Sequence, residues 1–291
     1  MKIETKGMLI GLVGVIIFGL TLPVSKLAVE VFSPAFISFG RAFVAGLAGL
    51  TYILVQRAPI PSWAIIKRMF LIVLGIIVCF PYLMTLAMAK GSSSHGGIIL
   101  GFMPILTTIV GVVKFKERPS KGFWIASLLG TSVVLIYALI QGSGTLSYMD
   151  FLLLGATVFS ALGYAEGGEL SRIMSPKIVI SWALVISLPI NGLVTYLTFQ
   201  PEYLQVDLQY WSSFLFLGLF SMYIAFFFWY EGLSIGGISR VSQVQLLQPF
   251  ITLVCANLLL SERLELINFV FAALVVSSVL VGKQMLVKRA N

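Results

Sequence analysis

Three charged residues stand inside long apolar runs of the chain: Lys26, Arg41 and Glu166. If such a run crosses a bilayer, a charge within it costs at least about 2.5–3.5 kcal/mol on insertion scales, so each needs a reason. Lys26 either reaches out to lipid headgroups, paired with Glu30 one turn on, or lines an internal cavity. Arg41 lies about 10 Å into its run at 1.5 Å per helical residue. There it is either a structural ion pair or helix cap, or an anion-binding group.

Glu166 and Glu169 are three residues apart and therefore share one face of a helix. Glu169 can pair with Arg172 at the rim of the span, whereas Glu166 lies one turn deeper. A carboxyl at that depth suits proton coupling or the binding of a cationic substrate, unless it pairs with a neighbouring basic side chain. Three nearby glycines would let another backbone approach closely: Gly163, Gly167 and Gly168.

A polar stripe recurs at three-to-four spacing along 237–260, and it consists of Ser242, Gln245, Gln248 and Thr252. Uncharged amides that faced lipid would be costly, so the polar stripe is expected to face protein or water. It either forms hydrogen bonds between helices or recognises a substrate through amide donors and acceptors. Pro249 beside it, and Pro104 in the first half of the chain, are expected to bend their helices near mid-membrane.

Other candidate pathway residues are aromatic or neutral. Tyr223 and Tyr230 share a face with Phe227, and this face serves either as packing or as the apolar wall of a pocket. Tyr164, two residues before Glu166, is included in the same candidate set. Asn191 is a lone polar residue in mid-span, which either links helices or contributes to the pathway.

The residue types needed for catalysis or metal binding are scarce. The chain has one histidine, His95, and two cysteines, Cys79 and Cys255, which lie in apolar runs. This predicts no metal site, no disulfide framework and no bound cofactor. No nucleophile–base pair stands out, and no phosphate-binding loop ends in Gly-Lys-Ser/Thr. The protein is therefore not expected to be an enzyme or to hydrolyse ATP.

The amino-acid composition predicts the kind of secondary structure that positions these residues. Of the 291 residues, 59% are apolar and 10% are charged, against about 45–50% and 25% in an average soluble domain. The mean hydropathy is +1.03. A soluble enzyme, a nucleic-acid binder and a disordered regulator are all disfavoured. With about 20 residues per span, the apolar runs predict ten transmembrane helices: 7–28, 34–56, 67–89, 94–114, 122–141, 149–171, 177–199, 211–232, 237–260 and 265–284.

The charges predict the orientation of these spans. With the N-terminus in the cytoplasm, all but four of the 19 basic residues fall at the cytoplasmic ends, the exceptions being Lys26, Arg41, Lys90 and Arg263. This is a positive-inside pattern, and it places both termini in the cytoplasm. The net charge of +8 then reflects membrane topology rather than a nucleic-acid partner.

An internal repeat relates the two halves of the sequence. At a shift of 145 residues, Gly91 meets Gly236, Ser94 meets Ser239, Pro104 meets Pro249, Thr107 meets Thr252, and Glu117-Arg118 meets Glu262-Arg263. Each half holds five spans, an odd number, so the second half enters the membrane upside down. Residues 1–145 and 146–291 are therefore expected to form two inverted five-helix repeats, an architecture typical of transporters.

The pattern of Phe18-Gly19, Pro23, Lys26, Ser33-Pro34, Arg41, Pro104, Glu117-Arg118 and Gly130 resembles the EamA-like members of the drug/metabolite transporter superfamily. A Trp is more common in that family where Phe18 stands. The resemblance covers nearly the whole chain and implies ten spans as two inverted repeats in a bacterial-type inner membrane. It also implies an exporter or exchanger, mostly of amino acids and related metabolites, with sugars, nucleotide-sugars or xenobiotics in some members.

The expected function is therefore secondary-active transport of a small molecule by alternating access through a central cavity, with protons as the candidate coupling ion. The expected partners are the substrate and the lipid bilayer, and a monomer is plausible. The alternatives are a passive channel or lipid scramblase, an intramembrane enzyme and a structural scaffold. A channel or scramblase would need a continuous polar pore, and an enzyme would need a His/Asp or Ser/His cluster at one membrane face.

Overall fold

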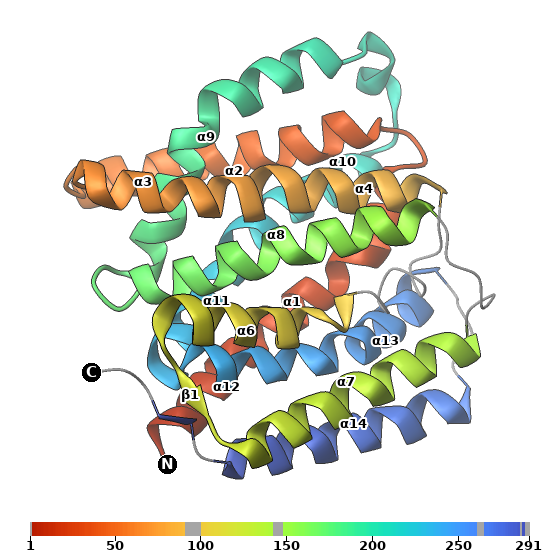
Figure 1. Cartoon of the computed structure of the whole chain (residues 1–291). Helices are drawn as coiled ribbons and strands as arrows, with labels where there is room; N and C mark the ends of the chain where they lie inside the picture. The colour runs from red at the N-terminus through yellow and green to blue at the C-terminus, as the bar shows by residue number, and fades with distance from the viewer. Residues whose placement is uncertain (1, 91–99, 142–147, 261–264, 286, 289–291) are drawn as a thin grey trace.

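The computed structural model describes residues 2–90, 100–141, 148–260, 265–285 and 287–288. Nearly all of them are helical and lie in one bundle (Figure 1). At one edge of the bundle α2 packs on α9, and at the opposite edge α7 packs on α14. The first helix begins and the last helix ends at the same end of the bundle (Figure 1).

The first half of the chain contains five helical stretches in its described part. They are α1 (Ile3–Ala28), α2 (Pro34–Gln56), the continuous run of α3 (Trp63–Ile72), η1 (Val73–Cys79) and α4 (Phe80–Lys90), then α6 (Met103–Phe115) and α7 (Lys121–Gln141). The predicted span 94–114 differs most. Its main helix begins at Met103, and residues 91–99 lie outside the described part.

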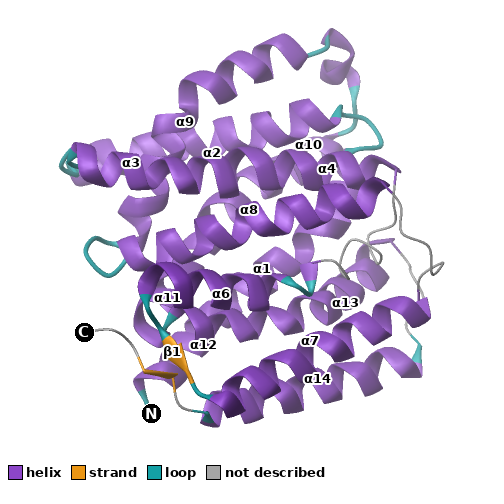
Figure 2. Ribbon diagram, in the orientation of Figure 1, coloured by secondary structure: helices purple, strands orange, loops and turns teal. Residues whose placement is uncertain are grey.

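The second half begins with α8 (Tyr148–Leu170) and α9 (Pro176–Thr198), followed by the short helix η2 (Pro201–Gln205). Next come the run of α10 (Leu208–Leu215), η3 (Phe216–Ile224) and α11 (Ala225–Gly236), the run of α12 (Ile238–Ser242), η4 (Gln243–Leu247) and α13 (Gln248–Leu260), and finally α14 (Leu266–Gln284). Two short antiparallel strands, β1 (Arg118–Pro119) and β2 (Val287–Lys288), pair near the start of α1 (Figure 2).

Eight of these helical runs are long and apolar enough to cross a membrane, and two shorter apolar helices, Met103–Phe115 and Lys121–Tyr137, accompany them. Many large apolar side chains, such as Leu54, Val113 and Leu258, are exposed on the outside of the bundle. Such a surface fits hydrocarbon rather than water. The chain is therefore a multi-pass, nearly all-helical membrane protein.

Two of the long helices change type in the middle. The segments η1 and η3 are π-helical, with wider turns than an α-helix, and each is continued by α-helix on both sides. They lie about one repeat length apart in the sequence, and α8 packs against η1 while α2 packs against η3. π-Helical turns are rare and are frequently found at functional sites.

The two halves of the chain are interleaved rather than separate. Helix α1 packs along α11 and α13 of the second half. The α1–α11 contact is close because it is lined by glycines: a Cβ added to Gly232 would lie 2.7 Å from the backbone O of Gly7 and from the backbone N of Gly11. Absence of side chains here allows backbone-to-backbone packing, as in other membrane helix pairs.

Helices α2 and α9 begin alike, with a Ser-Pro pair in which proline occupies the first turn. Proline is well placed there, since its missing N–H would have no partner within the helix. At α2 the Ser33 hydroxyl accepts a hydrogen bond from the N–H of Phe36 (3.2 Å), and the N–H of Ser33 donates to the hydroxyl of Tyr203 (3.1 Å). The start of α2, and with it the depth of Arg41, is thus fixed by η2 of the second half.

Candidate functional site

A central cavity lies where helices of both halves meet. The first half contributes α1, α2, η1 and α4, and the second half contributes α8, η3, α11 and α13. Its lining residues are Phe18, Thr21, Leu22, Arg41, Ile76, Phe80, Met84, Leu100, Tyr164, Ser221, Met222, Phe226 and Gln248. The volume open to water is about 20 Å³, which is room for about one water molecule. A metabolite can therefore enter only if the surrounding helices move apart.

Arg41 is the charged residue of the central cavity. It is 2% exposed, and its Nε and Nη1 atoms have no hydrogen-bond partner among the residues that the structure describes. Its backbone is held against η3, because Gly218 leaves room there: a Cβ at Gly218 would lie 3.1 Å from the Arg41 carbonyl oxygen. A buried guanidinium without counter-charge is costly, by several kcal/mol in real proteins. Among the described residues, Arg41 therefore has neither of the two structural roles considered from the sequence, an ion pair or a helix cap.

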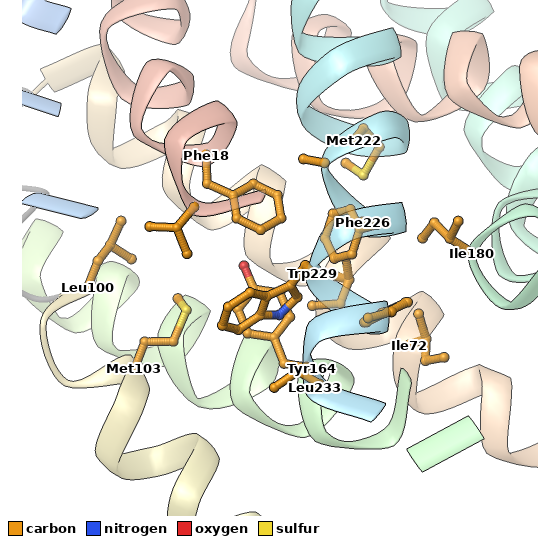
Figure 3. Close-up of a cluster of buried hydrophobic side chains, with 14 of the residues drawn as sticks. Phe18, Ile72, Leu100, Met103, Tyr164, Ile180, Met222, Phe226, Trp229 and Leu233 are labelled. Carbon is orange, nitrogen blue, oxygen red and sulfur yellow. The ribbon is translucent and has the colours of Figure 1, made fainter. Parts of the chain in front are cut away.

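An aromatic cluster lines the central cavity together with Arg41. The ring of Tyr164 on α8 stacks on Phe18 of α1, with centroids 6.1 Å apart, and meets Trp229 of α11 edge to face at 5.3 Å (Figure 3). Phe226 contacts both Phe18 and Tyr164. Tyr164 and Arg41 both line the central cavity. The structure therefore brings three of the predicted residues to one site: Arg41, Tyr164 and Gln248.

Neutral polar groups complete the lining. The hydroxyls of Thr21 on α1 and Ser221 on η3 are 2.7 Å apart, so they share a hydrogen bond between the halves. Gln248, from the polar stripe, also lines the central cavity. Thr21 and Ser221 were not among the residues predicted from the sequence. No pattern singled them out, since isolated hydroxyls are common in membrane helices and usually bond to their own backbone.

The polar stripe divides between two roles. Ser242 contacts the Pro104 carbonyl oxygen (3.3 Å) and the Thr108 hydroxyl (3.2 Å) of α6, and Thr252 donates to the Gly19 carbonyl oxygen (2.9 Å) of α1. These two members link helices. Gln245 lies between, with its Nε2 3.2 Å from the Met103 sulfur and its Oε1 buried without a partner among the described residues.

The two prolines act at helix starts rather than as kinks within helices. Pro104 lies in the first turn of α6 and Pro249 in the first turn of α13. The run 238–260 is interrupted just before Pro249 by η4, a 3₁₀ segment. 3₁₀ geometry within a long helix often marks a functional hinge, so the structure shows a change of helix type where the sequence predicted a bend.

Glu166 is fully buried but does not line the central cavity. Its carboxylate pairs with the Arg68 guanidinium of α3 and with the Lys114 ammonium of α6. This is the pairing with basic neighbours that the sequence left open. The partners themselves could not be identified from the sequence, where both belong to the positive-inside pattern. Glu169 pairs with Arg172 at 3.2 Å, as predicted.

The remaining predicted residues lie away from the central cavity. Asn191 is buried on α9 and donates to Ser187 one turn back (2.9 Å), so its observed bond is within one helix rather than between two. The Tyr223 hydroxyl bonds to Ser181 of α9 (2.7 Å). Lys26 is half-buried near the end of α1 and has an interaction of its own.

Of the three glycines of α8, Gly163 lets another backbone approach closely, as predicted, since a Cβ at Gly75 of η1 would lie 3.2 Å from the Gly163 backbone N; Gly167 and Gly168 accommodate side chains instead. A Cβ at Gly167 would overlap the Tyr230 ring, one at Gly168 would meet the Leu233 side chain, and one at Gly163 would meet Ile76. Tyr230 is fully buried and its hydroxyl donates to the Gly163 carbonyl oxygen (3.4 Å). Tyr230 is therefore a packing residue that fixes α11 on α8.

Comparison with known proteins gives consistent results. The model of the EamA-like transporter family matches residues 5–139 and again 147–281. An uncharacterized transporter of Bacillus subtilis, YdeK, is 38% identical over 90% of this chain and 92% of its own length. An uncharacterized transporter of Archaeoglobus fulgidus is 24% identical over 86% of this chain and 88% of its own length.

The fold is also found in a crystal structure of another protein. That structure aligns with a TM-score of 0.75 at 15% identity, and it covers 95% of this chain and 96% of the other. The family matches span most of the sequence, and they agree with the apolar helices and the buried polar centre described above. The chain belongs to the EamA-like transporter family.

Proposed function

We propose that this protein is a secondary-active transporter that moves small metabolites across the membrane by alternating access through the central cavity. The observation that carries the proposal is a buried arginine whose Nε and Nη1 have no partner among the described residues, in a space built by both halves of the chain. Since that space holds about one water molecule, substrate binding requires helices to separate. Movement of one half against the other would open the central cavity first to one side of the membrane and then to the other.

The proposed architecture is ten spans in two inverted five-helix repeats, 1–145 and 146–291. The π-helical segments η1 and η3 support it, because they occupy matching places in the third and eighth spans. The first-turn prolines of α6 and α13 match in the same way. The proposed location is a bacterial-type inner membrane with both termini in the cytoplasm, following the distribution of Lys and Arg.

In this orientation the described conformation is closed on the cytoplasmic side. Glu166 of α8 pairs there with Arg68 and Lys114 of the first half. Glu117, which follows α6, binds the start of α12 in the second half through the N–H groups of Ile238 (2.9 Å) and Ser239 (2.7 Å). Opening toward the cytoplasm must break these links between the halves.

The links give Glu166 a role in the proposed coupling to protons. If the halves separate, Glu166 loses contact with both cations, Arg68 and Lys114. We propose that this carboxylate takes up a proton in the open state. Opening and proton uptake would then accompany each other, so a proton gradient would drive transport, with export or exchange as the proposed direction.

Flux into proteoliposomes tests the proposal. Purified protein is reconstituted and loaded with a mixture of amino acids, other organic acids, amines and sugars, and loss of each solute is followed by mass spectrometry with and without a pH gradient. Saturable, counterflow-stimulated loss of a subset of solutes is expected. Single-channel currents would indicate a channel, lipid movement alone would indicate a scramblase, and background flux of every solute would overturn the proposal.

A further inference from the structure

We propose that Arg41 is the binding group for the carboxylate of the substrate, and that the substrate is a monocarboxylate with an apolar body. This deepens the proposed function and rests on it, since it concerns the same central cavity. The starting point is a missing counter-charge. A guanidinium that is 2% exposed would ordinarily have an anionic partner.

The buried carboxylates of the described chain are already engaged elsewhere. Glu166 is held by Arg68 and Lys114, and Glu117 accepts bonds from Ile238 and Ser239. Neither lines the central cavity, and no acidic side chain is among its lining residues. Since no described carboxylate compensates Arg41, we assign that negative charge to a bound molecule.

The geometry of the guanidinium indicates the kind of anion. Arginine presents its N–H donors in a planar fork that matches the two oxygens of a carboxylate, and Nε and Nη1 of Arg41 are without partners in the described structure. Among the described lining residues, Arg41 is the one basic side chain. One cation in apolar surroundings can offset one negative charge, so a dianionic phosphate or a dicarboxylate would bring an uncompensated charge.

The other residues that line the central cavity indicate the chemistry of the rest of the substrate. Phe18, Met222 and Phe226 provide an apolar wall, which suits an aliphatic or aromatic body. Thr21, Ser221 and Gln248 provide neutral hydrogen-bonding groups, which suit a hydroxyl, keto or amino group near the carboxylate. Because the described lining of the central cavity offers no carboxylate to compensate an ammonium, 2-hydroxy and 2-keto acids are expected to bind at least as tightly as the corresponding amino acid.

Binding to the purified protein tests this independently of transport. In lipid nanodiscs, thermal stabilisation and calorimetry compare phenyllactate, phenylpyruvate and phenylalanine with phenylalaninamide and 2-phenylethanol, which lack the carboxylate. Carboxylates are expected to bind at least about tenfold more tightly than these neutral or cationic analogues, as for a charge-assisted hydrogen-bonded pair. Equal affinities, or equal stabilisation by chloride and phosphate alone, would overturn the proposal.

The variant Arg41→Gln separates binding from folding. Because it removes an uncompensated buried charge, its melting temperature without ligand should equal or exceed that of the wild type, while carboxylate binding weakens by at least about tenfold. The matched control is Arg172→Gln, which removes an exposed arginine of the Glu169 pair and should bind as the wild type does. A fall in melting temperature for Arg41→Gln, or unchanged carboxylate binding, would contradict the assignment.

The two proposals fail in different ways. Arg41-dependent carboxylate binding without flux in proteoliposomes would leave this inference standing and overturn secondary transport. Saturable flux of amines or sugars, without Arg41-dependent carboxylate binding, would leave transport standing and overturn this inference.

Discussion

The carboxylate of Glu117 accepts a hydrogen bond from the backbone N–H of Ser239 at 2.7 Å, across 122 residues of sequence. The same carboxylate accepts from the N–H of Ile238 and from the Ser239 hydroxyl. It thereby caps the start of α12, where N–H groups have no partner within the helix. One side chain of the first half thus fixes the position of a helix in the second half.

Replacing Glu117 by Ala should destabilise the protein by about 1–3 kcal/mol, because two buried N–H groups lose a charged acceptor. Glu117→Gln should cost less, since one amide oxygen can still accept. Thermal unfolding in detergent measures both. Equal stability of Glu117→Ala and the wild type would show that the cap contributes nothing measurable.

Replacing Glu166 by Gln should reduce the pH dependence of flux more than the yield of folded protein. The neutral amide keeps the shape of the carboxyl but cannot exchange a proton, and it leaves Arg68 and Lys114 without their counter-charge. Flux is compared at several internal pH values in proteoliposomes. Glu169→Gln is the control, because Glu169 lies in an exposed rim pair. Unchanged pH dependence in Glu166→Gln would remove this carboxyl from the coupling mechanism.

Members of the polar stripe should respond differently to removal of their side chains. Gln248→Ala should weaken substrate binding, because Gln248 lines the central cavity. Gln245→Ala, beside Tyr164, should weaken it as well. Ser242→Ala should lower stability and leave affinity unchanged, since its hydroxyl bonds to α6. Affinity and melting temperature measured on the same samples distinguish the two effects, and a loss of affinity in Ser242→Ala alone would reverse this assignment.

Glycine substitutions should test the α1–α11 contact. A Cβ at Gly232 would lie 2.7 Å from backbone atoms of α1, so Gly232→Ala must push the helices apart, at a cost of about 1–3 kcal/mol. At Gly155 the nearest atom would be a Leu83 methyl at 3.7 Å, an ordinary contact. Gly155→Ala should therefore be neutral or slightly stabilising, by up to about 1 kcal/mol. Similar melting temperatures for the two variants would contradict the packing described here.

The helical membrane fold was predictable from the sequence because it depends on a local property. An apolar run of about 20 residues can satisfy its backbone only as a helix in lipid. The observed helices therefore coincide closely with most predicted spans, and the Ser-Pro pairs mark the starts of α2 and α9. Arg41 could likewise be identified from the sequence, because a charge inside an apolar run is costly in a membrane.

Contacts between distant segments were decided only by the tertiary structure. Whether Arg41 or Glu166 has a partner depends on which helices lie beside it, and hydropathy carries no information about helix neighbours. The folded chain gives Glu166 two cations from α3 and α6 and gives Arg41 none among its described residues. It also pairs Thr21 with Ser221, residues that no local pattern connects. The sequence determined which residues are costly in a membrane, and the packing decided which of those charges have a partner among the described residues.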